Sequence, residues 1–147
     1  MTQAIIFTNE SGGVSVCIPT GELSIEAVQL KDTPAGSIIV NVSDLPNQYN
    51  DFFDAWELTK SDSEFFSMSD FSNKYITVNF EKAKEITKKR LRAEREPLLQ
   101  AQDVAFQRAL EDGADTTVII AEKKRLRDIT DLADTESTLE GLRAIKV

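Results

Sequence analysis

The sequence contains no histidine, and this limits the chemistry that its other side chains could perform. The usual general base, the Ser–His and Cys–His nucleophile pairs and the commonest metal ligand are all missing. Carboxylate and lysine chemistry remain open, but no glycine-rich phosphate loop or dinucleotide motif accompanies them. The residue types therefore predict a protein that is not an enzyme and that needs no cofactor.

The remaining reactive or metal-binding candidates are one thiol and two acidic pairs. Cys17 lies in an apolar strand pattern without a basic neighbour, which favours a buried, inert thiol. As the single cysteine, it excludes an internal disulfide and a cysteine-based zinc site. The acidic pairs are Asp51 with Asp54 and Asp62 with Glu64. Neither matches a calcium-binding loop, so solvated carboxylates are the preferred interpretation and no metal site is predicted.

The most basic stretch, residues 82–95, holds seven Lys and Arg. A nucleic-acid site would favour a one-sided basic stripe, with aromatic side chains if the target is single-stranded. Here the cations point to several faces of the expected helix, and no aromatic residue occurs between Phe80 and Phe106. Glutamates at i,i+3 and i,i+4 spacing can pair with the cations. We therefore expect a solvated helix face rather than a nucleic-acid partner.

The elements that carry these residues fall into two regions of different charge. Residues 1–74 hold eleven acidic residues against three lysines, a net charge of 3 − 11 = −8, whereas residues 75–147 hold fourteen of each sign. The sequence thus predicts a small acidic α+β module at 1–58, a linker or loop at 59–74 and a helical hairpin region at 75–147. No window is apolar enough for a membrane span and no secretion signal is visible, so a soluble protein is expected.

The N-terminal module is predicted to be β-rich with one short helix. Strands are expected at 4–7, 14–18 and 37–42, with a turn-forming TNESGG sequence between the first two. Ser24 can cap a short helix, which the DTPAG sequence at 32–36 ends. A helix that crosses between strands of one sheet is the expected arrangement, and the predicted fold class of the chain is α+β.

The C-terminal region is predicted to be an antiparallel helical hairpin followed by a short terminal helix. Asn79 can cap the first helix, and Gly113 can end it. Pro97 lies within this helix, so a kink or a break is expected near 93–97. The second helix is expected to begin near Asp115 or Thr116, and a capping box at Ser137-Thr138-Leu139-Glu140 predicts the terminal helix.

Two sets of apolar residues are candidates for binding another protein. The first is an aromatic cluster, which is either core or an exposed anchor, because Trp and Tyr are enriched in interface hot spots. The second lies on the hairpin, whose amphipathic helices could bind partner helices or associate with a second copy of the chain. The predicted partner-binding residues are Phe52, Phe53, Trp56, Leu98, Leu99 and Phe106.

Two stretches of the sequence resemble proteins of tailed bacteriophages. The first runs from GGVSVCIPTGELSIEAVQL to FFDAWEL, and the second is VNFEKAKEITKKRLRAEREPLLQAQDVAFQRALEDGADTTVIIAEKKRLRDIT. Their order resembles small proteins that are typically encoded beside tail or tail-fibre genes. The second stretch is also similar to the C-terminal part of tail fibre assembly and tail chaperone-like proteins, in which R-x-x-R-x-x-L-L precedes a hairpin ending in L-R-D. Here these motifs are Arg92 to Leu99 and Leu126-Arg127-Asp128.

The resemblance covers most of the chain, and its motifs carry no catalytic residue. In one departure from the commoner pattern, Val104 rather than Trp follows Asp103. The resemblance implies a non-enzymatic structural protein that docks to tail or tail-fibre subunits of the virion after assembly in the host cytoplasm. The alternative that it implies is a tail fibre assembly chaperone that is absent from the mature particle.

Overall fold

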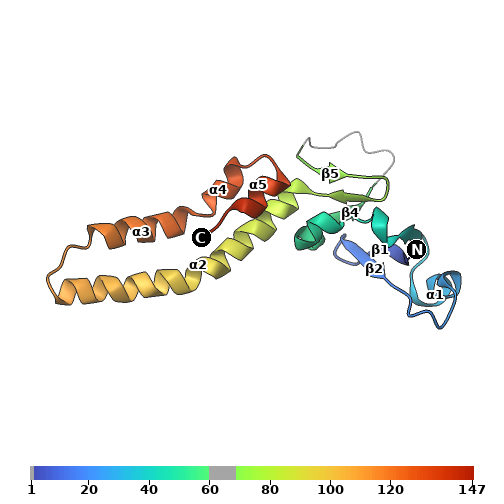
Figure 1. Cartoon of the computed structure of the whole chain (residues 1–147), viewed down its shortest axis with the longest axis horizontal. Coiled ribbons are helices and arrows are strands. Elements are labelled where there is room, and N and C mark those ends of the chain that lie inside the picture. The colour runs from blue at the N-terminus through green and yellow to red at the C-terminus, as the bar shows by residue number, and fades with distance from the viewer. Residues whose placement is uncertain (1, 60–68) are drawn as a thin grey trace. The chain divides into compact units, whose positions relative to one another are not determined.

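The computed structural model describes residues 2–59 and 69–147, and the chain divides into two compact units, Met1–Ala83 and Lys84–Val147 (Figure 1). The predicted boundary before Tyr75 therefore lies too early in the chain. The reason is that the strand after Tyr75 pairs with a strand of the first unit, so the first unit keeps the residues up to the start of the long helix.

The first unit begins with an antiparallel sheet of three strands in the order β2-β1-β3. The strands are β1 (Gln3–Thr8), β2 (Val14–Cys17) and β3 (Ile38–Asn41). The chain turns between β1 and β2 at Gly12, where a φ of 83° favours glycine, and the Asn9 carboxamide accepts two backbone N–H groups of the turn. The predicted hairpin is confirmed.

Helix α1 (Ile25–Asp32) connects β2 to β3. The Ser24 hydroxyl caps it by accepting the N–H of Ala27 at 3.3 Å. Because β2 and β3 are both antiparallel to β1 and flank it, they run parallel to each other, and the chain needs this crossover to join them. The predicted helix between strands of one sheet, and the α+β fold class, are therefore confirmed.

A second antiparallel sheet of the first unit has the order β4-β6-β5. Its strands are β4 (Trp56–Leu58), β5 (Phe71–Ser72) and β6 (Ile76–Val78), and the 3₁₀ helices η1 (Val42–Asp44) and η2 (Asn47–Ala55) precede it. The Asn73 carboxamide accepts the N–H groups of Tyr75 and Ile76 and so closes the turn between β5 and β6. The predicted linker at 59–74 is thus wrong at its C-terminal end, whereas 60–68 lie outside the described residues.

Buried side chains from both sheets form the core of the first unit. Three consecutive residues of β1, Ala4 to Ile6, are fully buried, so both faces of this central strand are covered. Other buried apolar side chains of the unit are those of Val14, Val40, Leu45, Phe52, Trp56, Ile76 and Val78.

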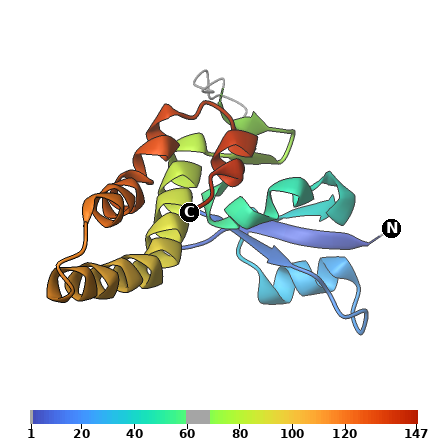
Figure 2. The same ribbon diagram turned by 60° about the vertical axis from the view of Figure 1, so that its left-hand side comes forward.

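The long helix α2 (Phe80–Glu111) passes through Pro97 without a break. Its first N–H groups are satisfied by two side chains, since Asp70 accepts from Phe80 at 2.7 Å and Asn79 accepts from Lys82 at 3.1 Å. The ribbon changes direction in its yellow middle part in both views (Figures 1 and 2). The predicted kink is therefore confirmed and the alternative, a break, is wrong. Proline removes one helical hydrogen bond and bends the axis, but the helix continues on both sides.

Three shorter helices complete the second unit: α3 (Thr117–Asp128), α4 (Asp131–Thr135) and α5 (Leu139–Ala144). Gly113 ends α2 with a φ of 66°, and α3 then runs back along α2 (Figure 1). The Thr138 hydroxyl caps α5 by accepting the N–H of Gly141 at 3.0 Å. The predicted hairpin and terminal helix are both present.

The core of the second unit lies at only one end of this helical hairpin. Its buried apolar side chains are those of Leu91, Leu126, Ile129, Ala133, Leu139, Leu142 and Ile145. From residue 92 to residue 125, a segment that the structure describes throughout, no side chain is buried. We call this segment the arm, and its two ends the base, near Leu91 and Leu126, and the tip, near Gly113.

Candidate interaction surfaces

The aromatic residues predicted to anchor a partner belong mainly to the core. Phe52 is 3% exposed and Trp56 is 1% exposed. The Trp56 indole donates to the carbonyl of Tyr49 at 3.1 Å, and the half-buried Phe53 ring lies 4.9 Å from the Trp56 ring. The prediction of an exposed anchor is therefore wrong for Phe52 and Trp56, because folding already buries both rings within the chain.

Two arginines of the basic stretch cap other helices of the second unit. Arg90 donates to the carbonyls of Leu142, at 3.4 Å, and Ile145, at 2.9 Å, at the end of α5. Arg95 donates to the carbonyls of Leu126 and Arg127 at the end of α3, at 3.3 and 2.6 Å. The last carbonyls of a helix have no partner inside it and carry partial negative charge, so guanidinium groups stabilise them. The prediction of a simply solvated basic face is therefore wrong at these positions.

A lysine of the same stretch joins α2 to α4. Lys88 Nζ lies 2.8 Å from Asp134 Oδ1 and 3.7 Å from Glu85 Oε1. The hydrogen bond from Lys88 lowers the pKa of Asp134, and the same bond raises the pKa of Lys88. Both groups are therefore held in their charged forms by the folded second unit.

This ion pair predicts an acid-sensitive contribution to stability. A carboxyl pKa that is lower in the folded chain stabilises it above the unfolded value of about 3.9, and the contribution is lost as the pH falls through the folded pKa. We expect the melting temperature of the Asp134→Asn variant to change less between about pH 5 and pH 2 than that of the unmodified chain. The Asp131→Asn variant is the control and should keep the full pH dependence; equal loss in both variants would contradict the assignment.

Within the arm, α2 and α3 meet along a narrow half-buried seam. On α2 the half-buried residues Arg95, Leu99, Gln102, Phe106 and Ala109 follow one another at steps of three and four. From α3, Lys123 Nζ lies 2.6 Å from Asp103 Oδ1 and 5.1 Å from the centre of the Phe106 ring. The predicted partner-binding residues Leu99 and Phe106 therefore lie on the seam between the two helices of the arm. Of the six predicted partner-binding residues, only Leu98 is exposed.

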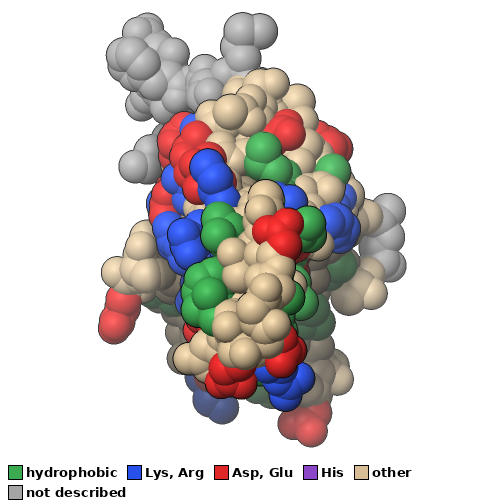
Figure 3. Space-filling view, turned by 90° about the vertical axis from the view of Figure 1, so that its left-hand side faces the viewer, with side chains coloured by type: hydrophobic (Ala, Val, Ile, Leu, Met, Phe, Trp, Pro, Cys, Tyr) green, Lys and Arg blue, Asp and Glu red, His purple; other side chains and the backbone are tan. Residues whose placement is uncertain are grey.

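Ten large apolar side chains are exposed among the described residues, and five of them belong to the arm. They are Leu98, Leu110 and Val104 on α2 and Val118 and Ile120 on α3, and Val118 is 80% exposed. In the space-filling view onto the end of the arm, apolar side chains lie beside charged ones at the surface (Figure 3). Val118 was missed by sequence reasoning, and Ile120 was expected in the apolar stripe of its helix. Neither residue fits the three-and-four spacing of the apolar stripe that joins Ile119 to Leu126. This mismatch is the signal in the sequence that could have identified both side chains as exposed.

A groove of about 520 Å³ lies between the two helices of the arm. Its lining residues are Gln102, Val118, Ile119, Ala121, Glu122 and Arg125. Arg125 Nη2 lies 2.7 Å from Glu122 Oε1, and this bond lowers the pKa of Glu122, so the charges of the pair cancel. Leu98, Ala105 and Ala109 lie one or two turns from Gln102 on the same side of α2. We call the groove with these three residues the groove face.

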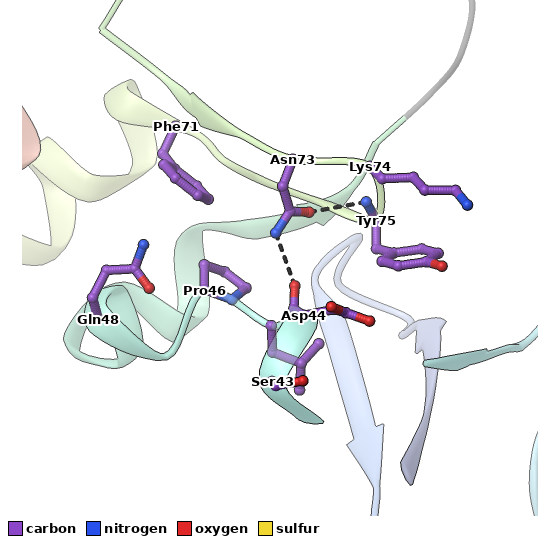
Figure 4. A pocket seen from close by; sticks show the side chains of 9 residues that line it. Ser43, Asp44, Pro46, Gln48, Phe71, Asn73, Lys74 and Tyr75 are labelled. Atoms are coloured by element: carbon purple, nitrogen blue, oxygen red, sulfur yellow. Dashed lines mark hydrogen bonds between the residues drawn. The ribbon is translucent and has the colours of Figure 1, made fainter. Parts of the chain in front are cut away.

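A second hollow, of about 420 Å³, lies in the first unit between the turn before η2 and the β5–β6 turn (Figure 4). Asp44 and Lys74 supply its charges, and Phe71 and Pro46 its apolar walls. The Asn73 amide group donates to the carbonyl of Asp44 at 2.9 Å, while its oxygen accepts backbone N–H groups. The Asn73 carboxamide therefore joins the two turns by hydrogen bonds, and the hollow is part of the packing between these turns.

The other sequence candidates do not assemble into a site among the described residues. No group of three or more metal-ligating side chains occurs in 2–59 and 69–147, and Asp62 and Glu64 lie outside these ranges. Cys17 is half-buried on the edge strand β2, where a buried thiol was expected. Within the described ranges, no helix is long and apolar enough to cross a membrane.

Comparisons with protein-family models, with curated proteins and with solved structures found no match. A functional proposal for this chain therefore rests on the arrangement of its own residues and on the sequence resemblance described above. In that arrangement, the arm combines exposed apolar side chains, a groove and no buried core.

Proposed function

We propose that the chain is a non-enzymatic bacteriophage tail protein that uses its arm to dock to other tail or tail-fibre subunits in the virion. The observation that carries this proposal is the absence of any buried side chain from residue 92 to residue 125. A helical hairpin that served only the fold of its own chain would not need to extend so far beyond its core.

The exposed apolar side chains of the arm favour protein binding over catalysis. Burying apolar surface contributes about 25 cal/mol per Å², so a partner that covers Leu110 and Ile120 gains free energy that the isolated chain does not obtain. The arm is also firmly attached at its base, where Arg95 caps α3. A preorganised helical element loses little conformational entropy when it binds, which supports a docking role.

The assignment to a phage tail is supported by the sequence resemblance. The R-x-x-R-x-x-L-L motif spans the base of the arm, where Arg95 binds the carbonyls at the end of α3 and Leu98 faces solvent. Within this motif, Arg95 holds the end of α3 against α2 and Leu98 remains available to a partner. The motif contains no group that would carry out a reaction.

Mass spectrometry of purified virions tests the proposal, together with capture of the tagged chain from infected cells. We expect the chain in virions and one or more tail or tail-fibre proteins in the captured fraction. The double variant Leu110→Glu with Ile120→Glu should lose the captured proteins, because both side chains are exposed and charges there oppose apolar docking. Val104→Glu, on the outer side of α2, is the control and should retain them.

Three other outcomes would each count against part of this proposal. Capture of a tail-fibre protein from infected cells, without the chain in virions, would favour the assembly chaperone. Absence from virions together with no captured tail protein would overturn the tail assignment. Retention of the partner by the double variant would place docking elsewhere on the chain.

A further inference from the structure

Between the base and the tip of the arm, a stretch that the structure describes throughout, one lysine of α3 makes the only polar side-chain contact with α2. Lys123 Nζ lies 2.6 Å from Asp103 Oδ1 and 5.1 Å from the centre of the Phe106 ring. Because Asp103 and Phe106 are one turn apart on α2, a single ammonium group reaches both. The ion pair between Glu122 and Arg125 lies within α3 and does not join the two helices. We call Lys123 with Asp103 and Phe106 the clasp.

The apolar contacts across the seam of the arm are incomplete. Leu99, Phe106 and Ile119 are only half-buried, whereas Leu91 and Leu126 at the base are fully buried. Helix α3 has 12 residues, and an isolated helix shorter than about 12–15 residues is only marginally stable in water. The helices of the arm therefore depend on the few contacts that cross the seam, and the clasp is the polar one.

Pro97 separates the arm from the base. Proline has no N–H, so the helical hydrogen bond to the carbonyl of Ala93 is missing within α2. Unfolding of α2 from Pro97 onward therefore breaks one hydrogen bond fewer than unfolding from another position. On the base side, Arg95 is bonded to the carbonyls of Leu126 and Arg127. The chain thus has a boundary at which an unfolded arm can meet a folded base.

We infer that the arm beyond Pro97 unfolds and refolds as a separate unit while the base stays folded, and that the clasp controls this equilibrium. Regions with few buried apolar contacts open at a lower free energy than the core of the same domain. Loss of the clasp favours the open arm but leaves the core of the second unit intact, because none of its three residues belongs to that core. Opening removes the groove face, since residues of both helices line it.

The equilibrium also regulates docking on the arm. A partner that binds the folded arm holds it closed by mass action, so docking and closure support each other. This consequence alone rests on the proposed function, whereas the opening concerns the purified chain. A chain that captures no tail protein would overturn the proposed function and leave the opening untouched. An arm that exchanges no faster than the base would overturn the inference and leave tail capture untouched.

Hydrogen exchange of the full chain, measured by mass spectrometry, tests the separate unit directly. Peptides from 98–125 are compared with peptides that contain Leu91 and Leu142, which are fully buried at the base. After correction for intrinsic rates, amides of the arm should exchange at least about 10-fold faster than those of the base. One common rate for arm and base would show that the second unit opens only as a whole and would overturn the inference.

Lys123→Met tests the clasp. The substitution removes the ammonium group but keeps an unbranched side chain of similar helix propensity. Exchange in the arm should accelerate about 5- to 10-fold, as expected for losing a cation–π contact together with a partly exposed ion pair, while the base stays unchanged. Asp103→Asn should accelerate it less, because the contact with Phe106 remains. Adding Asp103→Asn to Lys123→Met should have little further effect, because the two residues act through one contact.

Lys124→Met is the matched control for Lys123→Met. Lys124 is the next residue of α3, and its ion pair with Asp128 lies within that helix. Exchange in the arm should therefore change by no more than about twofold in this variant. Equal acceleration by the two lysine variants, or none by either, would overturn the role of the clasp.

Discussion

Replacing Trp56 with alanine is expected to lower the free energy of unfolding of the first unit by about 3–5 kcal/mol. The ring is 1% exposed, and its indole N–H donates to the carbonyl of Tyr49, so the variant loses both apolar burial and this hydrogen bond. Total stabilities are typically about 5–15 kcal/mol, so this is a large share. Hydrogen exchange measured by mass spectrometry should show faster exchange in β1 and β6.

Phe53→Ala provides the matched control for this variant. Phe53 contacts the Trp56 ring at 4.9 Å but is only half-buried, so its removal should accelerate exchange less. The comparison also separates the two interpretations of the aromatic cluster. If Trp56→Ala left exchange in β1 and β6 unchanged while abolishing partner capture, the ring would act as an anchor, and its place in the core would be wrong.

The second large effect is expected at the base of the arm, where Leu126→Ala should destabilise the second unit by about 2–5 kcal/mol. Leu126 is fully buried, and its carbonyl is one of the two that Arg95 caps. The cavity would lie beneath this capped end of α3, so the base should loosen and amides of α3 and α5 should exchange faster. Chemical denaturation followed by circular dichroism gives the free energy.

Ile120→Ala, on the same helix, is the control for Leu126→Ala. Ile120 is 53% exposed, so its truncation should change the free energy of unfolding by no more than about 0.5 kcal/mol. The pair therefore distinguishes the residues that hold the second unit together from those that are available to a partner. Equal destabilisation by both variants would show that the exposed apolar side chains of the arm serve its own stability.

The sequence by itself determined the features that depend on nearby residues. Turn formers between the first two strands, the Ser24 cap and the Gly113 end of α2 were all predicted and are present. The terminal helix is also present, but Thr138 caps it, one residue after the Ser137 that the predicted capping box would use. A cap or a turn is decided by hydrogen bonds between residues a few positions apart, so residue type and spacing are enough to predict it. The α+β class followed from the same local signals.

Tertiary structure decided the features that depend on residues far apart in the chain. Trp56 is core rather than anchor because β4 pairs with β6, and this pairing also moves the boundary of the first unit to Ala83. Arg90 and Arg95 are helix caps because α5 and α3 end beside them, more than thirty residues later. Of the predicted partner-binding residues Leu98 remains exposed, whereas Val118 appears as a candidate only when α3 lies along α2. Burial depends on contacts made in the assembled fold, so the spacing of nearby residues does not determine it.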